Sequence, residues 1–210
     1  MDLSVSRAVV TGGASGLGQA TARHFRERGA QVVLLDRDPA GARVARAMGA
    51  GFAETDVTDE DSVSRAIAAS VEAMGGIDIC VNCAGIVIGE KTLGREAPHS
   101  LAGFRRTVEI NLIGSFNGLR LAAAEMARNG RDENGVIVNT ASIAAFDGQK
   151  GQAAYAASKA GIAGMTLPIA RDLSSRNIRI CAIAPGIFAT PMLRGLPTEV
   201  QDGLAALAAE

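Results

Sequence analysis

The sequence has no tryptophan, one tyrosine, two histidines and three cysteines among its 210 residues. An odd number of cysteines argues against a disulfide framework and for a reducing compartment. No apolar run approaches the length of a membrane span, and the first ten residues, MDLSVSRAVV, lack the charged start and apolar core of a secretion signal. We therefore expect a cytoplasmic protein with no membrane partner.

Neither sign of charge dominates, since 21 basic and 22 acidic residues give a net charge of −1. Nucleic-acid binding requires a basic surface, so we expect no nucleic-acid partner.

The two histidines, His24 and His99, lie far apart in helical patterns. Cys80 and Cys83 have CxxC spacing, but they lie along a predicted strand and the chain offers no set of four ligands. We therefore expect no metal site.

Apolar segments alternate with helical patterns along the whole chain, and 48% hydrophobic content is enough for one well-cored domain, residues 1–210. Strands are predicted at 5–11, 31–35, 51–55, 77–81, 135–140 and 178–183, and helices at 19–29, 39–48, 59–74, 100–129 and 153–174. This alternation predicts an α/β fold with a doubly wound, Rossmann-like parallel sheet that binds ligands at the carboxyl ends of its strands. Six polar or special residues fall at such ends: Thr11, Asp36, Asp56, Asn82, Ser142 and Pro185.

The first predicted strand runs into the glycine-rich turn TGGASGLG and then a helix. Gly12, Gly16 and Gly18 have the spacing G-x-x-x-G-x-G, and their missing side chains would let the backbone approach a pyrophosphate at the positive end of the helix. Asp36, twenty residues after Gly16, suits the ribose hydroxyls of an adenosine and would repel a 2′-phosphate, although Arg37 could receive one. The turn has Ser15 where a cation would favour NADP. These residues predict NAD, with an unliganded glycine turn as the alternative.

Tyr155 and Lys159 are four residues apart in the last long helical pattern, so their side chains should lie on one face. A phenol titrates near pH ~10, so its use as a base near neutrality needs a shift of about 3 units, which one ammonium about 4 Å away could supply. Ser142, at the end of a predicted strand, could donate a hydrogen bond to a carbonyl oxygen. These three residues form a predicted proton-transfer set. The alternative is a surface tyrosine on an amphipathic helix.

The motifs TGGASGLG, NCAG, Asn111, Ser142, YAASK and Pro185-Gly186 followed by Thr190 together resemble the short-chain dehydrogenase/reductase family. The resemblance runs from the first strand to about residue 200. The segments VNCAGI, GVIVNTASIAAFDGQKGQAAY, GMTLPIARDL and IAPGIFATP resemble more narrowly the 3-hydroxyacyl-CoA dehydrogenases of that family. The resemblance implies an NAD-dependent oxidoreductase that interconverts a secondary alcohol and a ketone, foremost a 3-hydroxyacyl-CoA and a 3-oxoacyl-CoA. The alternatives are a 3-oxoacyl-[acyl-carrier-protein] reductase, a hydroxysteroid dehydrogenase and a non-catalytic dinucleotide-binding scaffold.

Residue by residue, the resemblance makes Tyr155 the general acid/base and Lys159 its tuner and ribose ligand. Ser142 would polarise the substrate oxygen, so that Ser142 and Tyr155 contact the substrate, and Asn111 would hold a proton-relay water. The implied NAD contacts are Gly12, Ser15, Gly16, Leu17, Gly18, Asp36, Asp56, Val57, Asn82, Cys83, Ala84, Gly85, Tyr155, Lys159, Pro185, Gly186, Phe188 and Thr190.

Two features concern the sheet edge and assembly. Members of the family continue through a further helix and a seventh strand, whereas this sequence ends at Glu210 after a helical pattern at 199–210, so we expect a sheet without that strand. The helical pattern at 153–174 carries a small-residue face, which with the helix around Asn111 predicts a homo-oligomer interface in a dimer or tetramer. That face consists of Ala156, Ala157, Ala160, Gly161 and Gly164.

Overall fold

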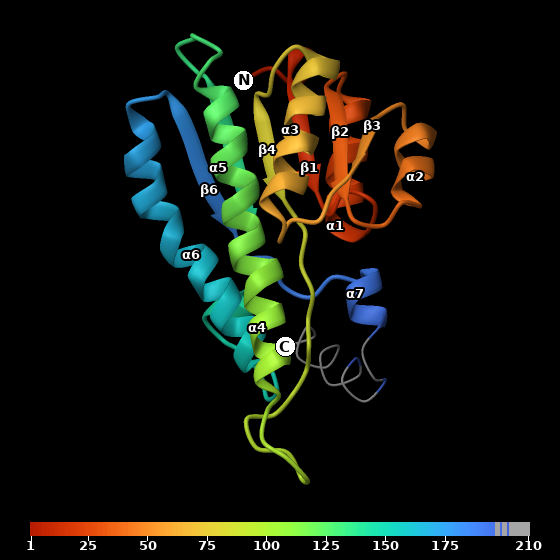
Figure 1. Cartoon of the computed structure of the whole chain (residues 1–210), viewed down its shortest axis with the longest axis vertical. Coiled ribbons are helices and arrows are strands. Elements are labelled where there is room, and N and C mark those ends of the chain that lie inside the picture. The colour runs from red at the N-terminus through yellow and green to blue at the C-terminus, as the bar shows by residue number, and fades with distance from the viewer. Residues whose placement is uncertain (196–197, 199–200, 202–210) are drawn as a thin grey trace.

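The structure is a computed structural model that describes residues 1–195, 198 and 201. Its centre is a six-stranded sheet in the order β3-β2-β1-β4-β5-β6, in which every neighbouring pair is parallel (Figure 1). The order reverses between β1 and β4, which is where a doubly wound sheet opens a crevice for a ligand. The predicted fold class is confirmed. The strands are β1 (Arg7–Thr11), β2 (Gln31–Asp36), β3 (Gly51–Glu54), β4 (Ile79–Asn82), β5 (Gly135–Thr140) and β6 (Ile178–Ile183).

Helices cover both faces of the sheet, because successive strand residues point to opposite sides. Val9 packs in one apolar cluster with residues of α3 and α5, whereas its neighbour Val10 packs in a second cluster with residues of α1 and α2. The α-helices are α1 (Gly16–Glu27), α2 (Gly41–Ala47), α3 (Glu60–Met74), α4 (Leu101–Val108), α5 (Gly114–Met126), α6 (Ala153–Ser174) and α7 (Pro191–Arg194). Shorter turns are the 3₁₀ turns η1 (Leu3–Val5) and η3 (Ile143–Ala145) and the π turn η2 (Glu109–Ile113).

Local sequence signals explain where several of these elements begin and end. The Asp59 side chain accepts hydrogen bonds from the N–H groups of Asp61 and Ser62 and so caps the start of α3. Gly75 ends the same helix in the left-handed conformation, with φ 77°, which a residue with a side chain adopts only at a cost.

The predicted elements differ from the observed ones mainly at their boundaries. The predicted bounds of β5, α6 and β6 are confirmed. The first strand begins at Arg7 instead of residue 5, because Val5 is 76% exposed in the turn η1 and has no sheet partner. The long helix predicted at 100–129 is interrupted by η2, which contains Asn111.

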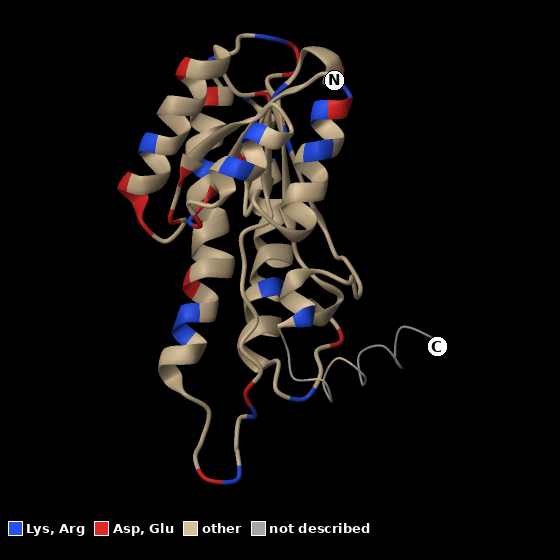
Figure 2. Ribbon diagram, turned by 90° about the vertical axis from the view of Figure 1, so that its right-hand side faces the viewer, with Lys and Arg blue, Asp and Glu red and all other residues tan. Residues whose placement is uncertain are grey.

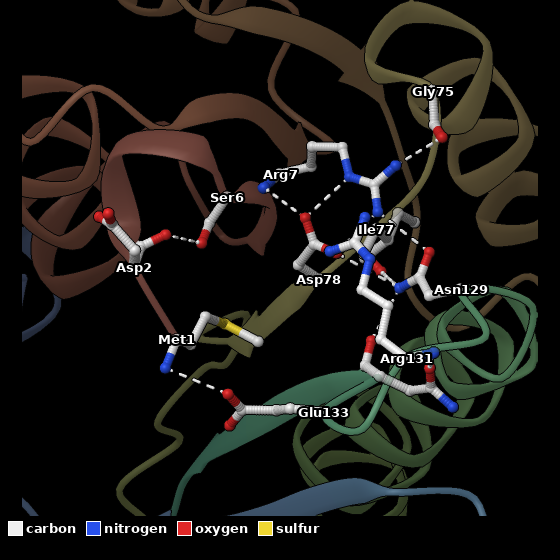
Figure 3. Close-up of polar contacts among 11 residues, drawn as sticks. Met1, Asp2, Ser6, Arg7, Gly75, Ile77, Asp78, Asn129, Arg131 and Glu133 are labelled. Atoms are coloured by element: carbon white, nitrogen blue, oxygen red, sulfur yellow. Dashed lines mark hydrogen bonds and ion pairs between the residues drawn. The ribbon is translucent and has the colours of Figure 1, made fainter.

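A buried ion pair joins the amino ends of β1 and β4 (Figure 3). Asp78, 2% exposed, accepts hydrogen bonds from the Arg7 backbone N–H at 3.0 Å and from Nε of its guanidinium at 2.7 Å. Arg131 and Asn129 bond the same carboxylate. Burial alone would raise the pKa of Asp78, but the Arg7 hydrogen bonds outweigh it and the pKa is lowered. This cluster lies at the end of the sheet opposite the predicted site, and it fixes the relative position of the two strands.

The structure shows the surroundings of the residues on which two further predictions depend. Within the small-residue face of α6, Gly161 packs inside the chain, because a Cβ there would lie 2.7 Å from Leu112 Cδ2, so Gly161 is not free for a partner. Gly164 by contrast faces open space. The helical pattern at 199–210 lies outside the described residues apart from Gln201. In the part of the chain that the structure describes, no helix is long and apolar enough to cross a membrane.

Candidate active site

Two adjoining cavities open at the carboxyl ends of the strands. The larger, of about 500 Å³, is lined by the glycine turn, by residues after β2, β3 and β4, and by α4, η2 and α6. The smaller, of about 150 Å³, is lined by the segments around Ser142 and Pro185. Tyr155 contributes to the walls of both cavities. A reaction between a ligand in one cavity and a ligand in the other would therefore take place beside its phenol.

The glycine turn forms the inner wall of the larger cavity. Gly12 has φ 62°, and a Cβ there would lie 2.7 Å from the Ala84 backbone nitrogen. A Cβ on Gly18 would overlap the carbonyl of Gly12. Both glycines are thus required for the turn to fold against itself and against the segment after β4. Helix α1 then begins at Gly16, and the Ser15 side chain makes no capping hydrogen bond. The first N–H groups of α1 therefore remain available to an anion at the cavity, as a pyrophosphate requires.

Asp36 and Asp56 lie further along the larger cavity. One oxygen of Asp36 accepts a hydrogen bond from the Ala14 N–H at 3.0 Å, and the other accepts one from the Asp38 N–H at 3.1 Å. These bonds fix the carboxylate and leave lone pairs for ribose hydroxyls. Hydrogen bonds from Thr58 lower the pKa of Asp56, and this effect exceeds that of burial, so Asp56 is ionised at neutral pH. The glycine turn, the free helix start and the two carboxylates together fit an adenine dinucleotide.

Ser142 and Lys159 both lie near Tyr155 and are buried. Ser142, 8% exposed, accepts a hydrogen bond from the Ala144 N–H and so begins the turn η3. Lys159, 5% exposed, donates from Nζ to the Thr140 carbonyl at 2.6 Å, and Nζ lies 5.7 Å from the centre of the Tyr155 ring. Burial lowers the pKa of the Lys159 ammonium from 10.5 to about 8, against a smaller opposing effect of Cys83. The expected placement of phenol and ammonium on one face of the helix is thus observed.

The expected effect of Lys159 on Tyr155 is not observed. Burial raises the pKa of the Tyr155 phenol above 10.0, and the hydrogen bond with Ser142 offsets this only in part. The physical reason is that the same enclosure that brings the ammonium near also removes water from the phenol. The prediction that Lys159 alone would bring this pKa toward neutrality is therefore wrong for the protein by itself.

Asn111 lies in the π turn η2 and is fully buried. Its amide oxygen accepts a hydrogen bond from the Ile86 N–H at 2.8 Å, and its amide nitrogen donates to the Ile86 carbonyl and to Ser158 Oγ, each at 3.0 Å. Both donor hydrogens of the side chain are therefore used within the protein. Positioning of the segment after β4 is the role that these bonds show, and the relay role implied by the family resemblance stays a prediction.

The other predicted cofactor residues divide into four groups. Asn82 is 1% exposed and does not line the larger cavity, and its side chain is hydrogen-bonded to Thr11 and Asn139 on the neighbouring strands β1 and β5. The smaller cavity is lined by Pro185, Gly186 and Phe188, and both cavities are lined by Thr190 and Leu17. The rest of the predicted set lines the larger cavity: Gly12, Ser15, Gly16, Gly18, Asp36, Asp56, Val57, Cys83, Ala84, Gly85, Tyr155 and Lys159.

Sequence reasoning missed several residues of the larger cavity, among them Thr140, Arg106 and Ile110. Thr140 was detectable, since it ends a predicted strand as Thr11 does. Arg106 and Ile110 lie within a helical pattern and carry no local signal, because only the packing of α4 beside the sheet brings them to the cavity. Among the described residues, no cluster of three or more histidine, cysteine or acidic side chains could hold a metal ion.

Residues 6–201 match the family model described as short chain dehydrogenase. The chain belongs to the short-chain dehydrogenase/reductase family. It is 51% identical over 206 residues to the 3-hydroxyacyl-CoA dehydrogenases type-2 of Bos taurus and Homo sapiens, with 94% of this chain and 79% of each relative covered. It is 41% identical to cis-4-hydroxycyclohexanecarboxylate dehydrogenase of Sinomonas cyclohexanicum, over 95% of this chain and 80% of that protein.

A solved structure shares the fold of this short-chain dehydrogenase along almost its entire length. The crystal structure of 3-hydroxyacyl-CoA dehydrogenase type-2 from Mycobacterium avium matches with a TM-score of 0.88 at 39% identity, covering 97% of this chain and 82% of that chain. Together with the family match and the dehydrogenase relatives, this makes the protein an oxidoreductase that acts on CH–OH groups. Dehydrogenases of this family generally use a nicotinamide dinucleotide.

Proposed function

We propose that this short-chain dehydrogenase uses NAD to interconvert a 3-hydroxyacyl-CoA and a 3-oxoacyl-CoA. The observation that carries the proposal is the position of Tyr155 in the wall shared by a dinucleotide-sized cavity and a second cavity that contains Ser142. The names of the relatives support the substrate class, since several of them are 3-hydroxyacyl-CoA dehydrogenases type-2.

The second cavity has the lining that an acyl chain requires. Its walls are mainly apolar, and Asp147 is its only charged side chain among the described residues that line it. Its polar lining includes the hydroxyl groups of Ser142 and Tyr155, where a carbonyl or hydroxyl oxygen would be bound. The apolar lining residues are Leu17, Val87, Ala141, Ile143, Ala144, Pro185, Ile187, Phe188, Met192 and Leu193.

In the oxidation direction, Tyr155 would take the proton from the substrate hydroxyl, and Ser142 would hold the same oxygen as it becomes a carbonyl. When bound, the oxidised nicotinamide supplies the hydride acceptor and a positive charge near the phenol. That charge favours the phenolate, which burial otherwise disfavours in this site. Lys159 lies between the Thr140 carbonyl and the larger cavity, where its ammonium would bind the nicotinamide ribose.

The preference for NAD over NADP rests on Asp36. Its carboxylate, held by two hydrogen bonds, lines the larger cavity. The glycine turn has Ser15 at the position where a cationic side chain would favour NADP. A 2′-phosphate dianion placed beside this carboxylate would be repelled, whereas ribose hydroxyls would donate to it.

The test is turnover with a panel of 3-hydroxyacyl-CoAs, a steroid alcohol and a 3-oxoacyl-[acyl-carrier-protein], each with both dinucleotides. Tyr155→Phe keeps the ring and removes the proton acceptor, so turnover should fall by a factor of ~10² or more while NAD binding changes little. Near-normal turnover of this variant would contradict the assignment of Tyr155. NADPH-linked turnover of the acyl-carrier-protein substrate would show a 3-oxoacyl-[acyl-carrier-protein] reductase instead. Fastest turnover of the steroid would show a hydroxysteroid dehydrogenase instead. NAD binding without any turnover would favour a scaffold.

We further propose a cytoplasmic homo-oligomer, dimer or tetramer. Three free cysteines are consistent with a reducing compartment. The packed region of α4, η2, α5 and α6 carries large exposed apolar side chains, including Ile113, Phe116 and Leu167. Gly164 on the same helix as Leu167 has open space around it, which would let a neighbouring helix approach closely. Basic and acidic residues are intermixed along the helices, which gives no support to a nucleic-acid partner (Figure 2).

A further inference from the structure

Two arginines at the larger cavity lack an acidic partner. Arg37 follows β2, and Arg106 lies on α4, a helix far from β2 in the sequence. Both line the cavity, and within the described residues neither guanidinium group makes a hydrogen bond or a salt bridge. Both lie near enough to Asp56 to help lower its pKa, after the larger effects of its hydrogen bonds with Thr58 and of burial. The two guanidinium groups and Asp56 therefore belong to one part of the cavity.

The charges that line the larger cavity balance. Asp36, Asp56 and Glu109 offset Arg37, Arg106 and Lys159, so the cavity has no excess positive charge to bind a phosphate dianion. The buried Val57 adds an apolar surface to the same wall. Asp56 accepts its described hydrogen bonds, both from Thr58, on Oδ1. Its Oδ2 is therefore available to an N–H donor. A neutral, flat ring with an amino group on its edge matches this combination better than an anion does.

We propose that Arg106 is a further dinucleotide-binding residue that stacks on the adenine, in the part of the cavity where the family resemblance already implies a cofactor contact of Asp56. A guanidinium is planar and weakly hydrated, so it stacks on aromatic faces where an ammonium cannot. Because Arg106 lies on α4, its contact with the adenine would connect that helix to the bound dinucleotide. The inference rests on the proposed function, since it concerns the same dinucleotide.

The test is calorimetric binding of ADP-ribose, which contains the adenosine and pyrophosphate but no nicotinamide. Arg106→Ala should weaken ADP-ribose about 3- to 30-fold, which is the range of a partly desolvated cation–π contact. Arg105→Ala is the matched control, because Arg105 precedes Arg106 on α4, carries the same charge and is exposed as Arg106 is, but does not line the cavity. Its affinity should stay at the wild-type value. Arg106→Lys keeps the charge and should recover only part of the loss.

Several outcomes separate the alternatives. Equal affinities for Arg106→Ala and Arg105→Ala would overturn the inference and leave the proposed function intact. If Arg106→Ala weakened the binding of 2′-phospho-ADP-ribose but not that of ADP-ribose, the inference would also be overturned, since Arg106 would then recognise the phosphate. Full recovery by Arg106→Lys would show that charge suffices and that no stacking occurs. A wild type that binds no ADP-ribose would remove the inference together with the proposed cofactor. Unchanged melting temperatures of the variants confirm that each one is folded.

Discussion

Replacing Lys159 with methionine removes a charge that folding places out of water, so the pH dependence of stability should change. Lys159 is 5% exposed, and burial lowers its pKa from 10.5 to about 8. The unfolded chain therefore holds this proton more tightly than the folded protein does. Between pH 8 and 10.5 the unfolded state binds more protons, and the free energy of unfolding rises with pH across that window.

The magnitude follows from the size of the pKa difference. Below about pH 8 both states are protonated, and the wild type carries the full cost of the buried ammonium, which is about 3 kcal/mol. Above about pH 10.5 both states are neutral and this cost is gone. Methionine has a similar unbranched stem and does not titrate in this range. The difference between wild type and Lys159→Met should therefore rise by about 3 kcal/mol across the window.

The assay is urea unfolding of both proteins at a series of pH values through this window. A constant offset between them is expected in addition, because the Thr140 carbonyl loses the donor that lies 2.6 Å away in the wild type. Tyr155 and Cys83 are present in both proteins, so their own titrations largely cancel in the difference. A difference that stays flat with pH would show that Lys159 keeps its ordinary pKa and would refute the reasoning from burial.

Four further tests, one of them with a matched control variant, concern other parts of the structure. Gly18→Ala should abolish dinucleotide binding measured by calorimetry, because its Cβ would overlap the Gly12 carbonyl, whereas Gly164→Ala, with nothing within 4 Å, should bind normally. Asp78→Asn should lower the free energy of unfolding, measured in urea at neutral pH, by about 2–4 kcal/mol. Because folding lowers the pKa of Asp78, the difference between wild type and variant should shrink as acid protonates the wild-type carboxyl. A difference that persists in acid would contradict an ionic role of Asp78. Asp36→Ala should narrow the ratio of NADP to NAD dissociation constants, and an unchanged ratio would remove Asp36 as the determinant. Gly164→Arg should shift the mass seen by light scattering toward the monomer, and a monomeric wild type would end the oligomer proposal.

The sequence predicted strand bounds best where an apolar run is bounded by turn residues. Residues 135–140 form β5 with the predicted bounds, and every second residue of that strand is buried. Residues 178–183 form β6 with the predicted bounds although only Ile178 is buried there, so the bounds did not depend on burial of the whole run. Val5 shows why the first boundary was wrong, since an apolar residue is not necessarily buried, and Asp2 caps a 3₁₀ turn there by accepting from the Ser4 N–H. The π turn around Asn111 was not predictable, because it accompanies hydrogen bonds to Ile86, twenty-five residues away.

Residues of the site were predictable when their role depends on local spacing. Tyr155 and Lys159 share a helix face for that reason, and the glycine turn follows a strand as expected. Roles that depend on burial or on distant packing were not predictable. The raised pKa of Tyr155 depends on enclosure by other segments. Asn82 ends its strand as predicted, but neighbouring strands determine that its side chain turns inward. Arg106 reaches the cavity only because α4 packs beside it.

The polar interior explains how the site is held in position. Ser158 Oγ donates to the Tyr155 carbonyl at 2.7 Å and accepts from the Asn111 amide, which in turn binds both backbone groups of Ile86. This chain of bonds connects the helix that carries the phenol to the segment that lines the larger cavity. Burying such groups is costly unless they are paired, and these contacts pair them, so the network resists displacement of any one member. The helix that carries the phenol is therefore held beside the larger cavity by buried side-chain hydrogen bonds, while the phenol itself bonds with Ser142, the residue expected to share the substrate oxygen with it.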